Sequence, residues 1–69
     1  MTAKQLVLTA CAYSGISASE LARRVGWSAQ NLNKRLTTGK LSIEEWEKIA
    51  AALGADLNLG FTFPDGKTI

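Results

Sequence analysis

Hydrophobic residues along this chain of 69 residues recur with a helical period up to Gly54 and with a period of two after it. The helical period predicts four helices, at residues 3–14, 18–25, 29–38 and 43–53. A glycine follows each of these segments directly, as is common where helices end. The first 54 residues are therefore expected to form one compact, mainly α domain, followed by a separate C-terminal element at residues 55–69.

Three of the expected helix starts share one pattern, in which an apolar residue precedes a serine and a second apolar residue follows five positions after the first. The serine is expected to cap the helix, a contact worth about 1 kcal/mol, and the two apolar residues to pack as a hydrophobic staple. The staple pairs are Ile16 with Leu21, Trp27 with Leu32, and Leu41 with Trp46. Glu20 and Glu45 lie three residues after their serines and are expected to complete capping boxes.

The apolar faces of these helices define one expected core. On the first helix we expect a stripe of Leu6, Ala10 and Tyr13, with Val7 and Cys11 beside it. The remaining expected core positions are Leu21, Val25, Leu32, Leu36, Trp46, Ile49, Ala50 and Leu53. Both tryptophans are interpreted as staple and core residues rather than as platforms for a ligand.

Residues 57–63 alternate between apolar and small or polar side chains, which predicts a half-buried β-strand. Pro64, Asp65 and Gly66 then favour a turn that folds the chain back as a hairpin. Three remaining residues cannot pair with a strand of seven, and an unpaired edge favours association with another chain. We therefore expect an antiparallel dimer contact, and the alternative is a hairpin that covers the core of a monomer. The expected dimer residues are Leu57, Asn58, Leu59, Gly60 and Phe61.

The segment at 29–38 is almost without apolar residues, because only Leu32 and Leu36 can anchor it to a core. A helix this polar is typical of a surface that meets a partner, and amides and cations match base edges and phosphates. Charge is distributed accordingly, with a net +4 over residues 17–40 and −3 over residues 41–56, although the whole chain carries only +2.

Several other classes of protein are disfavoured by composition. The chain has no histidine, so the usual acid–base group is absent, and we expect no enzyme activity. Cys11 is the only cysteine, so neither an internal disulfide nor a zinc site is expected, and no cofactor or small-molecule ligand is evident. No signal peptide or long apolar run is visible, which favours a reducing cytoplasm over a membrane or the exterior.

Residues 17–36 resemble the helix-turn-helix of the lambda-repressor-like class, the Xre or Cro/repressor type of phage and bacterial regulators. Leu21, Ala22, Gly26 and Leu32 carry the resemblance, which extends over roughly residues 3–54. There are two departures. Ala18 replaces a glutamine common in the family, and Arg35 occupies a position that is usually apolar, with Leu36 taking its place. These departures leave two rotations of the third helix open.

The resemblance implies a third helix that reads the major groove of duplex DNA. Gln30 would pair with adenine, Lys34 with guanine, and Ala29 would touch a thymine methyl group. Asn33 is the base reader in the alternative rotation of the helix. The expected contacts to the DNA backbone are Ser17, Ser19, Ser28, Asn31, Arg35, Thr38 and Lys40.

Two functions remain open from the sequence. The first is a small transcriptional repressor that reads a palindromic operator as a homodimer, since a chain of this size gains burial by pairing. The second is a protein-interaction module, antitoxin-like or antirepressor-like, that retains the helix-turn-helix fold. The charge distribution and the amide-rich third helix favour DNA.

Overall fold

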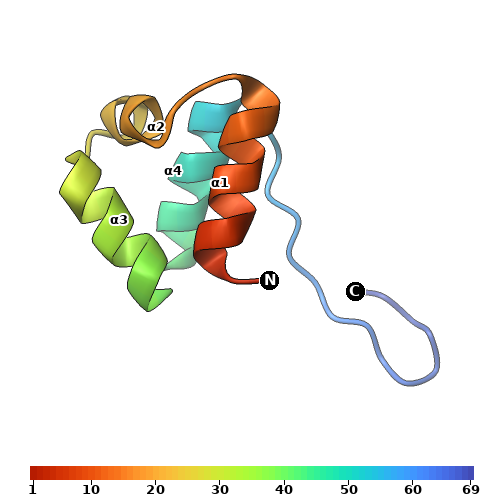
Figure 1. Ribbon diagram of the computed structural model, residues 1–69. Helices are drawn as coiled ribbons and strands as arrows, with labels where there is room; N and C mark the ends of the chain where they lie inside the picture. Colours follow the sequence, from red (N-terminus) through yellow and green to blue (C-terminus); the bar gives the residue numbers. More distant parts are fainter.

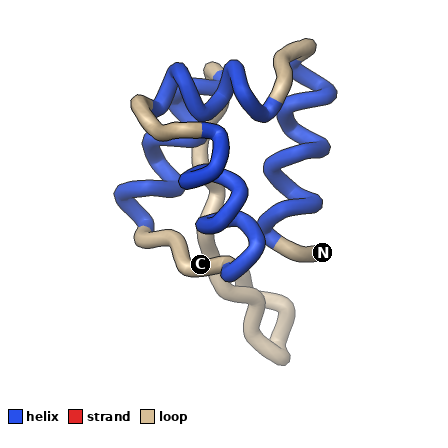
Figure 2. Tube along the Cα trace, turned by 60° about the vertical axis from the view of Figure 1, so that its left-hand side comes forward, coloured by secondary structure: helices blue, strands red, loops and turns tan.

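The computed structural model describes residues 1–69 and contains four helices followed by a C-terminal arm, which we define as residues 55–69 (Figure 1). The helices are α1 (Ala3–Ser14), α2 (Ala18–Val25), α3 (Ala29–Thr38) and α4 (Ile43–Leu53). These bounds confirm the four predicted helices. α2 crosses at one end of the molecule, above α1 and α4, and α3 lies on the opposite flank from the arm (Figure 1). In Figure 2, α3 lies in front, with α1 on one side of it and α4 on the other.

Local capping explains why the helices begin where they do. Ser17, Ser28 and Ser42 each accept a hydrogen bond from the backbone N–H three residues later, as predicted. The predicted capping box at Ser42 and Glu45 is also confirmed. A fourth cap starts α1 and was not expected from the serine pattern. The Thr2 hydroxyl accepts from the backbone N–H of Gln5, and the side-chain oxygen of Gln5 accepts from the backbone N–H of Thr2.

The capping box predicted for Glu20 is wrong. The Ser17 side chain accepts from the backbone N–H of Glu20, but the Glu20 carboxylate does not accept from the backbone N–H of Ser17. It accepts hydrogen bonds from Arg23 and Arg24 instead, at i+3 and i+4 on the same helix. Two guanidinium groups within reach are stronger partners for a carboxylate than one neutral backbone donor.

The core consists of seven buried side chains from all four helices. They are Val7, Cys11, Leu21, Ala22, Leu32, Leu36 and Ile49. Trp27 and Trp46 are half-buried and pack against this cluster, which confirms their interpretation as staple and core residues. Leu36 rather than Arg35 is buried after Leu32, so α3 has the rotation that Leu36 requires.

The core prediction for α1 is wrong at two of its positions. Leu6 is 49% exposed and Tyr13 is 94% exposed, whereas Val7 and Cys11 form the buried side of the helix. Apolar residues occur on more than one face of α1, so periodicity alone does not select the face that contacts α2, α3 and α4. The stripe through Leu6, Ala10 and Tyr13 instead borders solvent.

The strand predicted for residues 57–63 is also wrong. Every residue of the arm is exposed, and its only β-pairing is a single antiparallel bridge between Thr62 and Thr68. Phe61 and Ile69 exchange two backbone hydrogen bonds, and the N–H of Gly66 bonds to the carbonyl oxygen of Phe63 at 2.9 Å, so the predicted turn and fold-back do form. A narrow hairpin that packs on nothing lacks the burial that stabilises a regular strand.

Candidate nucleic-acid interface

The turn between α2 and α3 joins the two helices of the motif, which pack against each other. Gly26 has a φ of 82°, a left-handed conformation that a residue with a side chain adopts only with strain. The N–H of Trp27 then bonds to the carbonyl oxygen of Ala22 at 2.9 Å and closes the turn. Ala22 is buried in the core beside this turn, where its small side chain lets α3 approach α2.

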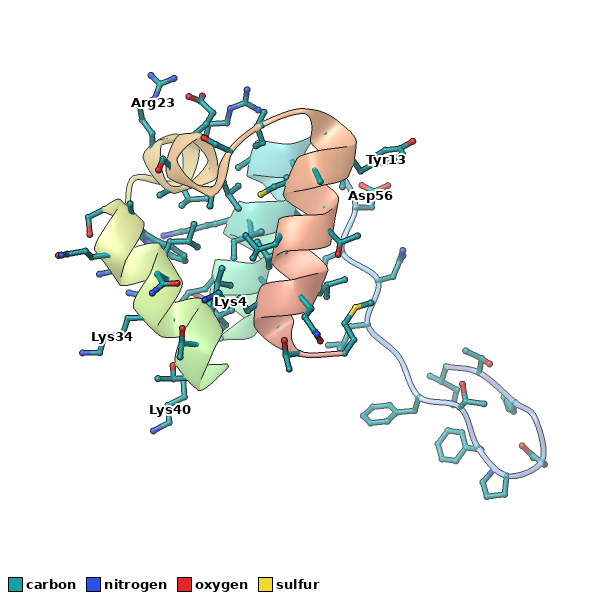
Figure 3. The ribbon with its side chains drawn as sticks, viewed as in Figure 1. Lys4, Tyr13, Arg23, Lys34, Lys40 and Asp56 are labelled. Carbon is teal, nitrogen blue, oxygen red and sulfur yellow. The ribbon has the colours of Figure 1, made fainter.

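α3 presents its polar side chains to solvent and keeps only its two leucines in the core. The four residues predicted to read bases are all exposed: Ala29, Gln30, Asn33 and Lys34. Gln30 and Lys34 are four positions apart and therefore project from one side of the helix. The side chains of Lys34 and Lys40 extend outward from this flank of the molecule (Figure 3). This flank, formed by the exposed side of α3 and the residues around its ends, is the α3 face.

The hydroxyl groups predicted to contact the DNA backbone lie at the start of α2 and at the two ends of α3. Ser17, Ser19 and Ser28 are exposed, and the Oγ atoms of Ser17 and Ser28 accept the capping N–H bonds at 3.0 Å. A capping hydroxyl still has its own O–H to donate. Thr38 uses its hydroxyl within the protein, donating to the carbonyl oxygen of Lys34 at 3.0 Å, and it thereby helps to end α3.

Arg35 differs from the other predicted backbone contacts because its guanidinium is held by three neighbours in the protein. It forms an ion pair with Glu45, lies 4.4 Å from the centre of the Trp27 ring, and donates from Nε to Oδ1 of Asn31. Its side chain is only 32% exposed. Arg35 thus connects α3 to the turn before it and to the start of α4.

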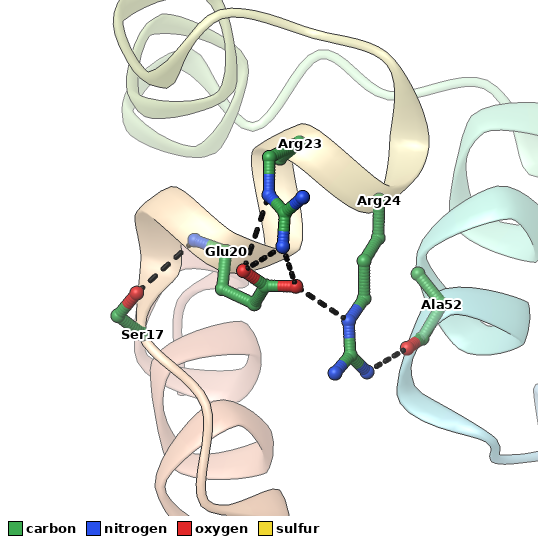
Figure 4. A network of polar contacts seen from close by, with 5 residues as sticks. All are labelled: Ser17, Glu20, Arg23, Arg24 and Ala52. Atoms are coloured by element: carbon green, nitrogen blue, oxygen red, sulfur yellow. Dashed lines mark hydrogen bonds and ion pairs between the residues drawn. The ribbon is translucent and has the colours of Figure 1, made fainter.

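A second polar network joins α2 to α4 (Figure 4). Glu20 accepts from Arg23 and Arg24, and Arg24 also donates to the backbone carbonyl of Ala52 at 3.1 Å. The hydrogen bonds from Arg23 and Arg24 lower the pKa of Glu20, and the hydrogen bond that Arg23 donates to Glu20 raises the pKa of Arg23. The i+3 and i+4 spacing of two arginines after Glu20 is the sequence signal for this network, which links α2 to the last turn of α4.

Two of the side-chain cations without an ion pair lie on the α3 face, and the others, Lys4, Lys48 and Lys67, lie on α1, α4 and the arm. Arg23 and Arg24 share Glu20, and Arg35 pairs with Glu45, so these cations are at least partly neutralised. Lys34 and Lys40 form no ion pair with any acidic residue of the chain. An incoming polyanion would therefore meet two free ammonium groups beside exposed amides and hydroxyls.

The family model for the Cro/C1-type HTH DNA-binding domain matches residues 10–58. This range includes α2, the turn at Gly26, α3 and α4, and it contains the motif at 17–36 on which the resemblance rests. The resemblance is therefore confirmed. No curated protein and no solved structure matches the chain. None of the four helices is both long and apolar enough to cross a membrane.

Proposed function

Because the chain belongs to the family of Cro/C1-type HTH DNA-binding domains, we propose that it is a transcriptional repressor that recognises a specific duplex sequence and occupies a promoter. The observation that carries the proposal is the division of α3 into two sides. Leu32 and Leu36 are buried, and the amides and the unpaired Lys34 are exposed. This arrangement leaves the polar side of the helix free to enter the major groove.

Sequence would be read by the exposed side of α3. Gln30 has the two-sided amide that pairs with adenine, Lys34 donates to guanine, and Ala29 offers a methyl group to thymine. Asn33 is also exposed and is the competing reader. Its substitution therefore distinguishes the two rotations of the helix relative to the groove.

Affinity for DNA of any sequence would come from groups around the ends of the motif helices. Lys40 supplies charge, and Ser17, Ser19 and Ser28 supply hydroxyl donors to phosphate oxygens. Thr38 lies at the C-terminal end of α3, where it would support Lys40, whose N–H bonds to the threonine hydroxyl at 3.4 Å.

The test is selection of bound duplexes from a random pool, followed by titration of the enriched site at several salt concentrations. If each protomer of a dimer neutralises about three phosphates, log K should fall against log salt with a slope of roughly −5. Failure to enrich any sequence, together with a slope near zero, would reject the DNA-binding proposal. The remaining candidate would then be the protein-interaction module.

We further propose that the repressor is a homodimer that binds a palindromic operator. The arm leaves the body on the side away from α3, so pairing there would leave both recognition helices free (Figure 1). Residues 57–60 make no backbone hydrogen bond within the protomer, and Leu59 and Phe61 are more than 70% exposed. Antiparallel contact through Leu57, Asn58, Leu59, Gly60 and Phe61 would pair the free backbone N–H and C=O groups and bury the exposed apolar side chains.

An apolar groove beside the arm would provide further burial in such a dimer. It has a volume of about 280 Å³ and lies between α1, α4 and the start of the arm. Leu6, Ala10, Trp46 and Leu53 contribute to its lining, and these include residues that the protomer leaves partly exposed. A twofold dimer of this kind would place its recognition helices about 34 Å apart, which corresponds to one turn of DNA.

Asn58→Pro tests the dimer without removing any apolar side chain. No hydrogen bond of the protomer uses the Asn58 N–H, so proline should leave the helical circular dichroism unchanged. It should also convert the dimer to a monomer in sedimentation and weaken operator binding. Asn58→Ala retains the N–H and is the matched control. A wild-type monomer at tens of micromolar, or an unchanged dimer in the proline variant, would reject pairing through the arm.

A further inference from the structure

Arg35 and Asn31 form a unit on the α3 face, and its chemistry determines what each residue can offer to DNA. We infer that Arg35 contacts no phosphate and is instead a positioning residue, which turns the Asn31 amide so that its NH₂ group faces outward. The inference rests on the proposed DNA-binding function. It replaces the sequence-based expectation that Arg35 itself holds the DNA backbone.

The orientation of the Asn31 amide follows from the donor and acceptor inventory of the pair. Arginine has only donors, so the atom that meets Arg35 Nε must be the amide oxygen, as the structure has it. With Oδ1 occupied, Nδ2 and its two hydrogens are the free part of the side chain. Asn31 can then donate to a phosphate oxygen but is poorly placed to accept from a base.

The guanidinium is itself held in place by two side chains outside α3, Glu45 on α4 and Trp27 in the turn before α3. Glu45 has one oxygen on Arg35 and the other on the Ser42 N–H at 2.8 Å, so the carboxylate is fixed to the first turn of α4. The Trp27 ring lies 4.4 Å from the guanidinium carbon and limits motion on another side. With Nη1 on Glu45 and one face of the guanidinium over the Trp27 ring, Nε is left to donate to Asn31.

This arrangement also explains why Arg35 is a poor phosphate ligand. Its charge is offset by Glu45, and its Nη1, its Nε and one face of the guanidinium are already engaged by Glu45, Asn31 and the Trp27 ring. Asn31 is exposed and belongs to the first turn of α3, where the Ser28 hydroxyl accepts its backbone N–H. The amide at this helix end is therefore the group that meets the DNA, and the arginine behind it sets its direction.

A double-mutant cycle separates the two roles. One variant in the cycle is Asn31→Ala. The other is the paired change Arg35→Met with Glu45→Gln, which keeps the net charge of the chain and leaves a glutamine oxygen for the Ser42 cap. Glu45→Gln alone is the control. Operator affinity and its salt dependence are measured for the wild type, for Asn31→Ala, for the paired variant and for the protein that carries all three substitutions.

Asn31→Ala should weaken operator binding by about tenfold for each protomer, as expected for loss of one hydrogen bond to a charged group. The paired change should weaken binding in the wild-type background and by less than about twofold when Asn31 is already alanine. The salt slope should stay the same throughout, because a neutral amide displaces no counterion. If Arg35 did contact a phosphate, its removal in the paired variant would instead make the slope shallower by about 0.9 for each protomer.

A readout on the free protein guards against a loss of folding. In the paired variant, the ¹H–¹⁵N signals of the Asn31 side-chain NH₂ should shift while the backbone amide signals outside the network remain in place. Additive losses of affinity, a shallower salt slope in the paired variant, or an Asn31→Ala protein with wild-type affinity would each overturn the inference. The last result would leave sequence-specific binding by the wild type intact, whereas failure of the wild type to bind DNA would reject both proposals.

Discussion

Deletion of residues 59–69 should separate the stability of the helical domain from its function. All seven core residues lie between Val7 and Ile49, and the backbone hydrogen bonds made by residues 59–69 stay within that segment. The shortened chain retains Leu57 and Asn58, which contribute to the groove beside α1 and α4. Nothing that the deletion removes is buried in the protomer.

The magnitude of each effect follows from these contacts. The free energy of unfolding should change by less than about 0.5 kcal/mol, the range typical of surface changes away from structural features. Operator affinity should fall by about 10²-fold or more, because two linked half-site contacts exceed a single one by about that factor. Non-specific binding per protomer should change little, since the α3 face is intact.

Urea denaturation followed by far-ultraviolet circular dichroism measures the first effect, and sedimentation with operator titration measures the second. Unfolding should be monitored at a protein concentration where the full-length chain is monomeric, so that loss of dimer does not enter the comparison. A loss of more than about 1 kcal/mol would refute the view that the arm lies outside the core. Undiminished operator affinity would refute its role in pairing.

Other substitutions test single side chains. Gln30→Ala should weaken binding to the preferred site by about 1–3 kcal/mol and leave non-specific binding nearly unchanged, as pool selection and titration would reveal. Lys40→Ala should weaken binding to all sequences and make the salt slope shallower by about 0.9 per protomer, in the same titrations. Leu32→Ala should cost about 2–5 kcal/mol of unfolding free energy in urea, and exposed Thr37→Ala less than about 0.5. The pKa of Glu20 is lower in the folded protein than its ordinary value near 4.5, so the stability that Glu20 contributes is present above pH 4.5 and is lost as the pH falls through the folded pKa. Glu20→Gln should remove that part of the acid sensitivity, as measured by thermal unfolding at a series of pH values.

The helix bounds were predictable because local chemistry sets them. Ser28 and Ser42 cap helices with their own side chains, and Gly26 accepts a backbone conformation that most residues avoid. These effects depend on neighbours within about one helical turn. Which face of α1 is buried depends instead on three other helices, and this is why Tyr13 was misplaced.

The site could be predicted in outline but not in detail. Exposure of Gln30 and Lys34 follows from the leucines that α3 must bury, and the base contacts themselves stay predictions. The ion pair of Arg35 with Glu45 joins residues on two helices, so it cannot be predicted from the spacing of residues along one helix. The strand at 57–63 failed because alternation shows only that two faces differ; a strand also needs a partner and a surface to cover.

Cys11 gives the molecule an internal reporter of its own opening. It is the only cysteine, it is 3% exposed within the core, and burial raises the pKa of its thiol. A thiol reagent can therefore react only when α1 moves away from its neighbours, and the labelling rate counts such events under native conditions. Because Cys11 shares the core with Leu32 and Leu36 of α3, the effect of operator DNA on this rate would show whether a ligand held on the outer side of α3 also reduces opening of the core.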